Sequence, residues 1–152
     1  MAGRHYEDFS VGEEAISPSV TLTEAGIIEF ALQYDPQRFH ISREAAEASP
    51  YGGLIASGFH TLVLAFRMFF HLGFITETGL GSPGIDELRW TEPVRPGDTI
   101  RTKVSVLEKR ESKSRPELGI MKLAFSVLNQ RDQVVCTFST AAFIARRGHK
   151  RK

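Results

Sequence analysis

Residues 99–147 have the pattern of three long strands separated by two short turns. The first strand, TIRTKVSVLEKRES, alternates in polarity, so that one of its faces would carry Ile100, Thr102, Val104 and Val106. The strands IMKLAFSVLNQ and VVCTFSTAAFIARR follow after turns at 115–119 and 131–133. We predict an antiparallel meander, because connections this short join neighbouring antiparallel strands.

Two further strands and an apolar helix come before this meander. The segment EEAISPSVTL, 13–22, predicts an extended strand with a proline at the edge of the sheet. IDELRWTEPV, 85–94, predicts a second strand, and RPGD, 95–98, predicts the turn after it, closed by Asp98. The segment SGFHTLVLAFRMFFHLG, 57–73, predicts a helix capped by its serine and ended by its last glycine. Since this helix is apolar on nearly every side, we expect it to be buried.

Together these elements predict one α+β domain over residues 1–152, with its core at about 5–146. A long antiparallel sheet wrapped round a buried central helix is the hot-dog arrangement. We expect the basic C-terminal tail, 146–152, to be disordered. Because such a sheet leaves a long edge strand, we expect a homodimer or a higher homo-oligomer.

Composition argues against several classes of partner. The formal net charge of +1 gives no strong field for nucleic acid or for a membrane surface. The longest apolar segment carries Arg67 and His71 and is too short to span a bilayer. The single cysteine, Cys136, has no partner for an internal disulfide, and the N-terminus has no apolar stretch of signal-peptide length, so we expect a cytoplasmic protein. Metal-ligand and phosphate-loop spacings are absent.

The stretch YDPQRFH, 34–40, places an acid, Asp35, five positions before a histidine, His40, and can be either a polar loop or an acid–base pair. A helix capped by Thr23 should end near Tyr34, because Pro36 disfavours a helical conformation in the residue before it. Asp35 then lies on a turn, and a short helix should follow over 41–49. Taken alone, Asp35 is as good a turn former as an acid, and His40 can equally satisfy a hydrogen bond in the core.

Three segments in order give the chain a resemblance. These are Asp35 and His40 with four residues between them, GGLIASGFHT at 52–61, and GIDELRWTEPVRPGDTIRTKVSV at 84–106. Together they resemble the MaoC-like family of (R)-specific enoyl-CoA hydratases and related acyl-thioester dehydratases. The resemblance implies reversible hydration of a trans-2-enoyl-CoA to an (R)-3-hydroxyacyl-CoA, with no cofactor or metal beyond the CoA thioester itself.

The resemblance also implies roles for particular residues. Asp35 and His40 would share the protons of one water, and a dry pocket with a raised pKa for Asp35 would help that exchange. The N–H of Gly58 would bind the thioester oxygen, and a glycine there would leave the thioester free to approach the backbone. Further candidates for substrate contact are Ser57, which can equally be a helix cap, Phe66 as a wall of the acyl pocket, and Arg38 as a partner for a second carboxylate.

Several positions depart from the family pattern. Gln37 and Arg38 stand where asparagine and proline are frequent, Ser57 replaces a histidine found in one subgroup, and Phe66 replaces a serine of some members. Three functions therefore remain open: a hydratase, a thioesterase on the same fold, and a non-catalytic acyl-CoA-binding protein. The acyl carrier is expected to be CoA, with acyl carrier protein as the lesser alternative.

Overall fold

A computed structural model describes residues 3–148 and confirms the α+β class. A short 3-10 helix, Tyr6–Asp8, precedes the first strand. The helices are α1 (Glu24–Tyr34), α2 (Arg38–Ile41), α3 (Arg43–Glu47) and α4 (Gly58–Phe70). The strands are β1 (Glu14–Ile16), β2 (Val20–Thr21), β3 (Asp86–Trp90), β4 (Thr99–Glu111), β5 (Leu118–Leu128) and β6 (Val134–Ala145).

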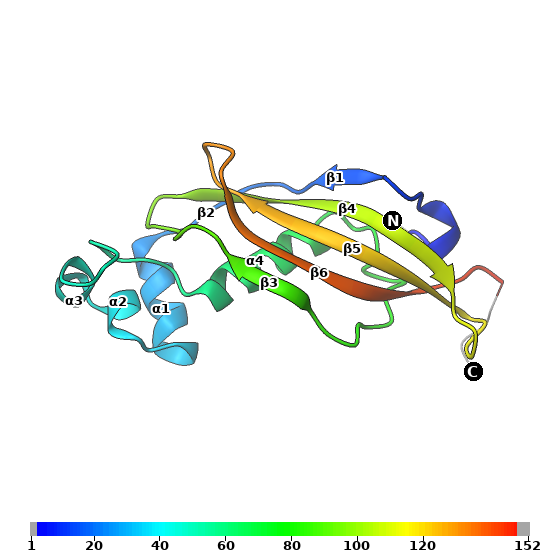
Figure 1. The fold of residues 1–152 in the computed structure, drawn as a ribbon, viewed down its shortest axis with the longest axis horizontal. Coiled ribbons are helices and arrows are strands. Elements are labelled where there is room, and N and C mark those ends of the chain that lie inside the picture. Colours follow the sequence, from blue (N-terminus) through cyan, green and yellow to red (C-terminus); the bar gives the residue numbers. More distant parts are fainter. Residues whose placement is uncertain (1–2, 149–152) are drawn as a thin grey trace.

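The predicted meander is the centre of the sheet. Strands β4, β5 and β6 pair antiparallel in chain order, and the sheet runs β1-β4-β5-β6-β3 with β2 also paired to β4 (Figure 1). The strand expected over 13–22 is divided into β1 and β2 at Ser17–Ser19. Pro18, at this break, has no N–H to give to a ladder, and β1 lies at a sheet edge, where a proline is tolerated.

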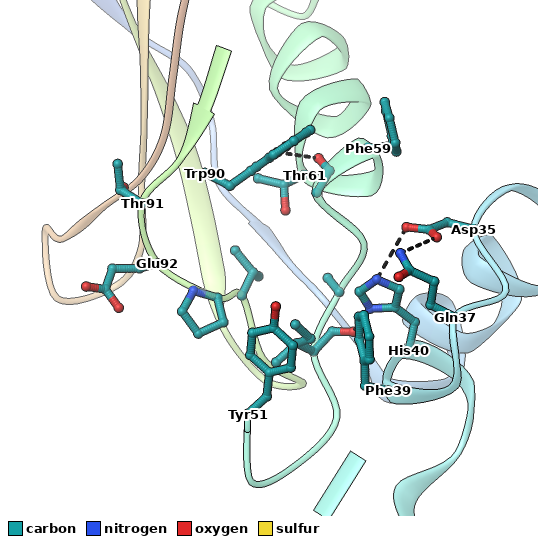
Figure 2. A pocket seen from close by; sticks show the side chains of 15 residues that line it. Asp35, Gln37, Phe39, His40, Tyr51, Phe59, Thr61, Trp90, Thr91 and Glu92 are labelled. Carbon is teal, nitrogen blue, oxygen red and sulfur yellow. Dashed lines mark hydrogen bonds and ion pairs between the residues drawn. The ribbon is translucent and has the colours of Figure 1, made fainter. Parts of the chain in front are cut away.

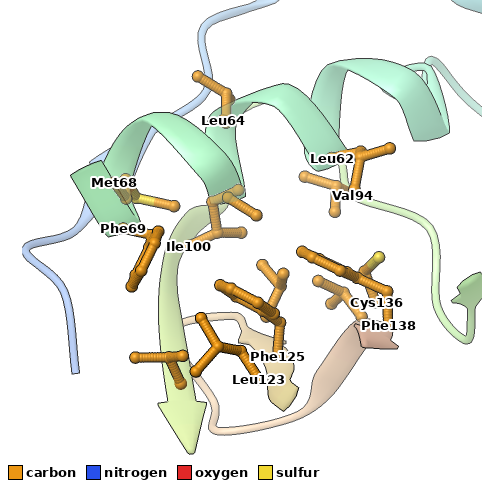
Figure 3. Close-up of a cluster of buried hydrophobic side chains, with 14 of the residues drawn as sticks. Leu62, Leu64, Met68, Phe69, Val94, Ile100, Leu123, Phe125, Cys136 and Phe138 are labelled. Carbon is orange, nitrogen blue, oxygen red and sulfur yellow. The ribbon is translucent and has the colours of Figure 1, made fainter. Parts of the chain in front are cut away.

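The core lies between α4 and one face of the sheet. The alternation expected in β4 is confirmed, since four of its side chains are buried there: Ile100, Thr102, Val104 and Val106. Opposite them on the neighbouring strands, the rings of Phe125 and Phe138 stack with their centroids 4.6 Å apart (Figure 3). Cys136 is fully buried beside them.

The expected burial of α4 is incomplete in the single chain. Five apolar side chains of the helix are buried: Leu62, Leu64, Ala65, Met68 and Phe69. The other side exposes a row of apolar side chains, with Phe59 at 55%, Val63 at 49% and Phe70 at 44%. One twisted sheet cannot enclose a helix, so this exposed face of α4 needs another surface to cover it.

Helices α1, α2 and α3 lie together at one end of the sheet, beside the start of α4 (Figure 1). Thr23 caps α1 by accepting a hydrogen bond from the N–H of Gly26, and α1 ends at Tyr34, both as predicted. Ser42 caps α3 in the same way, through the N–H of Ala45. The sequence did not predict α2, a single turn that carries His40.

The start of the C-terminal tail contacts the body of the protein. Arg146 pairs with Glu111 and Glu7, and Arg147 pairs with Asp8. The disorder expected of the tail stays a prediction. The remainder of the expected disordered tail, 149–152, lies outside the described residues.

Candidate active site

Asp35 and His40 come together, as the sequence predicted. Asp35 is the C-cap of α1, and the short turn through Pro36 leads into α2, which carries His40. The Nε2 atom of the buried His40 lies 3.3 Å from Oδ2 of Asp35. Phe39, partly buried against the core, packs edge-on against the imidazole with the ring centroids 4.5 Å apart. Packing against Phe39 therefore holds His40, and the turn through Pro36 holds Asp35.

The second nitrogen of His40 determines how the ring can act. Nδ1 lies 2.7 Å from the carbonyl oxygen of Ile55, and a carbonyl oxygen can only accept, so Nδ1 carries a hydrogen. In the neutral ring this leaves the lone pair on Nε2, which faces Asp35. A water that donates one O–H to Nε2 and the other to the carboxylate satisfies both acceptors, and the imidazole is then oriented to take a proton.

The Asp35 carboxylate accepts two hydrogen bonds and has one further close contact. Ser57 donates its hydroxyl to Oδ2 at 2.7 Å, and Gln37 donates its amide to Oδ1 at 2.8 Å, beside the contact with His40. Burial raises the pKa of Asp35, but the hydrogen bonds donated by Ser57 and Gln37 oppose burial, and the pKa lies below its ordinary value. The raised pKa that would help Asp35 to pass on a proton is not found here, because this carboxylate is well supplied with donors.

Ser57 joins the acid to the central helix. Its side chain is fully buried, and its Oγ accepts the N–H of Phe59 at 3.2 Å while donating to Asp35. The sequence left open whether Ser57 caps α4 or contacts substrate, and the structure places it as the cap. The same hydroxyl fixes the acid relative to the N-terminus of α4.

Gly58 is the first residue of α4, so no earlier helical turn accepts its N–H. The indole of Trp90 lies directly over it: a Cβ on Gly58 would lie 2.6 Å from Trp90 Nε1, which donates to the Gly58 carbonyl at 2.8 Å. Glycine was expected at this position because it leaves a thioester free to approach the backbone. The structure adds a packing reason, because any side chain here would collide with Trp90.

Asp35, His40 and Trp90 line one cavity of about 470 Å³ between α1–α2, the start of α4 and the segment after β3 (Figure 2). The polar side chains on its wall are Asp35, Gln37, His40, Tyr51, Thr61, Trp90, Thr91 and Glu92. Gly58 also lines this cavity, so a bound molecule can reach the acid, the imidazole and the free end of α4 together.

Two other sequence candidates lie elsewhere. Arg38 is exposed on α2 and does not line this cavity. Phe66 packs against Phe125 and Phe138, with ring centroids 5.8 Å and 5.3 Å away, and lines a separate apolar cavity of about 310 Å³. In the single chain, therefore, neither residue meets the Asp35–His40 pair. His60, two residues after Gly58, stacks on Phe30 with the ring centroids 4.5 Å apart.

Several residues of the cavity wall were not among the sequence candidates, Trp90 and Thr61 among them. Trp90 lies on β3 and stands half-exposed beside Gly58. Thr61 was not considered, although its position three residues after Gly58 puts it on the same helix face. Among residues 3–148, no group of three or more His, Cys, Asp or Glu side chains is placed to hold a metal ion. No helix in that part of the chain is long and apolar enough to cross a membrane.

Known proteins are similar to this chain in sequence and in fold. The model of the MaoC like domain family matches residues 8–124. The MaoC-like dehydratase from Rhodospirillum rubrum is 36% identical, with a TM-score of 0.89 over 97% of this chain and 100% of that chain. The mesaconyl-CoA hydratase of Cereibacter sphaeroides is 31% identical over 96% of this chain, which spans only 42% of that enzyme.

The fold has a further relative. RV0216 of Mycobacterium tuberculosis, described as a double hot-dog fold, matches 99% of this chain and 47% of its own length with a TM-score of 0.80. At 21% identity this likeness concerns the fold alone, and it confirms the hot-dog arrangement. With a family model that covers both the Asp35–His40 turn and α4, the chain belongs to the MaoC-like dehydratase family.

Proposed function

We propose that the protein is a hydro-lyase that reversibly adds water to a trans-2-enoyl-CoA and forms an (R)-3-hydroxyacyl-CoA. The observation that carries the proposal is the 3.3 Å approach of His40 Nε2 to Asp35 Oδ2 on the wall of one cavity that Gly58 also lines. Membership of a dehydratase family and the likeness to a CoA-ester hydratase support the same reaction class.

The pair can handle both protons of the reaction. His40 Nε2 takes a proton from the water as its oxygen bonds to C3, and Asp35 orients that water and stabilises the imidazolium. The pair returns one proton to C2, so that the net change is the addition of one water and both groups recover their starting states. A lowered Asp35 pKa suits this division, because the carboxylate is ionised before the reaction begins.

The N-terminus of α4 stabilises the negative charge that the reaction creates. Negative charge builds on the thioester oxygen when water attacks, and an unpaired N–H in the first turn stabilises it with the help of the helix dipole. Gly58 supplies that N–H on the cavity wall. No step of this chemistry requires a redox cofactor or a metal ion.

We also propose that a second copy of the chain covers the exposed face of α4. Phe59, Val63 and Phe70 are too apolar for a solvent-facing surface, and β3 is an edge strand with Trp90 half-exposed. A symmetric contact between two copies covers both the exposed face of α4 and the edge strand β3. The acyl-CoA then enters near the subunit boundary, because Phe59 and Trp90 also line the cavity.

The decisive test is hydration of crotonyl-CoA, followed as loss of the enoyl absorbance. Asp35→Asn and His40→Ala should each lower kcat by about 10²–10⁴-fold while the variants keep their far-ultraviolet circular dichroism. His71→Ala is the matched control, since His71 is exposed at the other end of α4 and should leave the rate unchanged.

The alternatives give different results in the same experiment. A thioesterase would release free thiol from butyryl-CoA without consuming the enoyl group. A non-catalytic binding protein would bind butyryl-CoA but turn over neither substrate. Either outcome for the unmutated protein, or full activity in both the Asp35 and the His40 variant, would refute the proposal.

A further inference from the structure

Thr61 presents a buried hydroxyl to the cavity. It stands on α4 three residues after Gly58, is only 2% exposed, and lines the same 470 Å³ space as Asp35 and His40. Figure 2 shows its side-chain oxygen directed into the cavity rather than back along the helix. A polar atom in this position meets whatever the cavity binds.

This hydroxyl differs from those of the other buried threonines. Thr78 donates to the Arg4 carbonyl, Thr102 to the Ala65 carbonyl at 3.3 Å, and Thr140 to the Gly84 carbonyl at 2.7 Å. The Thr61 hydroxyl has no hydrogen bond within the described part of the chain, not even to the carbonyl one turn earlier, a partner that helical threonines often use. Among the described residues, the side-chain atom that is both buried and unpaired is His60 Nδ1, so the Thr61 oxygen reaches the surface of the cavity, where a bound molecule can meet it.

The charge of the cavity narrows the choice of that partner. Of the described residues on its wall, Asp35 and Glu92 are acidic and none is Lys or Arg. A second carboxylate on the acyl group would therefore meet negative charge without a cationic partner. A neutral oxygen that gains negative charge only during the reaction fits better.

The position on the helix identifies the oxygen. Side chains of an α-helix lean towards its N-terminus, so Thr61 reaches back towards the first turn, where Gly58 offers its N–H. We propose that the Thr61 hydroxyl is a second donor to the thioester oxygen, beside the Gly58 N–H. This assignment rests on the proposed hydratase function and adds a side-chain donor to its backbone donor.

A donor of this kind acts mainly on the transition state. The thioester oxygen is a weak acceptor in the ground state and a strong one once charge develops, so losing one donor lowers kcat by about 10²-fold or more. The binding of an unreactive thioester should change little. A purely structural threonine would instead alter stability and leave the rate per folded molecule unchanged.

The experiment compares Thr61→Val, which keeps the shape of the side chain, with Thr61→Ser, which keeps the hydroxyl. Thr102→Val is the matched control, because it removes a buried threonine hydroxyl that is bonded inside the protein. Crotonyl-CoA hydration gives kcat and KM, and butyryl-CoA binding is read from the fluorescence of Trp90, the single tryptophan of the chain.

Thr61→Val should lose about 10²-fold in kcat, with KM and butyryl-CoA affinity within about threefold of the unmutated protein. Thr61→Ser should keep most of the rate, and Thr102→Val should keep all of it. Unchanged kcat in Thr61→Val, a loss confined to KM or affinity, or an equal loss in Thr61→Ser would overturn the assignment. If the unmutated protein fails to hydrate crotonyl-CoA, the hydratase function fails and the assignment falls with it; hydration without dependence on Thr61 refutes the assignment alone.

Discussion

Replacing Ser57 by alanine tests how the acid is held. The Ser57 hydroxyl makes two partly buried hydrogen bonds, one donated to the Asp35 carboxylate at 2.7 Å and one accepted from the Phe59 N–H at 3.2 Å. Loss of a helix cap costs about 1 kcal/mol, and loss of a hydrogen bond to a charged group costs about 1.5–3 kcal/mol. Because one hydroxyl makes both bonds, the two costs overlap, and we expect Ser57→Ala to lose about 2–3 kcal/mol.

The matched control is Ser42→Ala. Ser42 caps α3 through the Ala45 N–H at 3.3 Å and has no contact with a catalytic group, so its loss measures capping alone. Urea unfolding followed by circular dichroism gives both free energies. Ser57→Ala should exceed Ser42→Ala by at least about 1 kcal/mol, the part due to the charged hydrogen bond. Equal losses would refute the claim that Ser57 stabilises the Asp35 carboxylate.

The difference should also depend on pH. The pKa of Asp35 lies below its ordinary value of 3.8 in the folded chain, so the unfolded chain takes up this proton first as the pH falls. The stabilisation is therefore complete above the ordinary pKa and is lost as the pH falls through the folded value. The gap between unmutated protein and Ser57→Ala should be constant from pH 7 to about pH 5 and should narrow below pH 4.

Three further substitutions or treatments follow from the structure. Gly58→Ala should lose about 1–3 kcal/mol in urea unfolding because its Cβ meets Trp90, and the loss should shrink when Trp90→Ala is present; an unchanged loss in that background would contradict the packing argument. Val63→Asp should convert a dimer into a monomer in analytical ultracentrifugation, whereas Val11→Asp, exposed away from that face, should not; a Val63→Asp dimer would show that another surface pairs. Cys136, whose pKa burial raises to about 11, should resist a thiol reagent at pH 8 until urea unfolds the chain; rapid labelling of native protein would contradict its burial.

Local sequence signals predicted much of the fold because each depends on neighbours in the chain. Alternation in β4, the caps Thr23 and Ser42, and the end of α1 before Pro36 are all set within a few residues. The turn 95–98 is confirmed as well, with the Asp98 carboxylate accepting the Arg95 N–H at 2.8 Å and Gly97 in the left-handed region. Each of these features depends mainly on residues that are close in the chain.

The parts that sequence missed depend on distant segments. Trp90 reaches Gly58 from 32 residues away, and Ser57 reaches Asp35 from 22 residues away. The periodicity of apolar residues in the sequence predicts neither contact. The exposed face of α4 was missed for a related reason: the composition of a helix shows that it seeks apolar surroundings, but the width of the sheet decides how much of it one chain can cover.

The direction of the Asp35 pKa shows how such distant contacts alter chemistry. A carboxyl in an apolar pocket without donors would have a raised pKa and could act as an acid, as the motif suggested. Here donors from Ser57 and Gln37 overcome burial, so the group is a carboxylate at rest. Proton removal from water then falls to His40, whose Nε2 is left as the acceptor by the bond between Nδ1 and the Ile55 carbonyl. The motif names the two groups, but their hydrogen-bond partners decide which of them begins as the base.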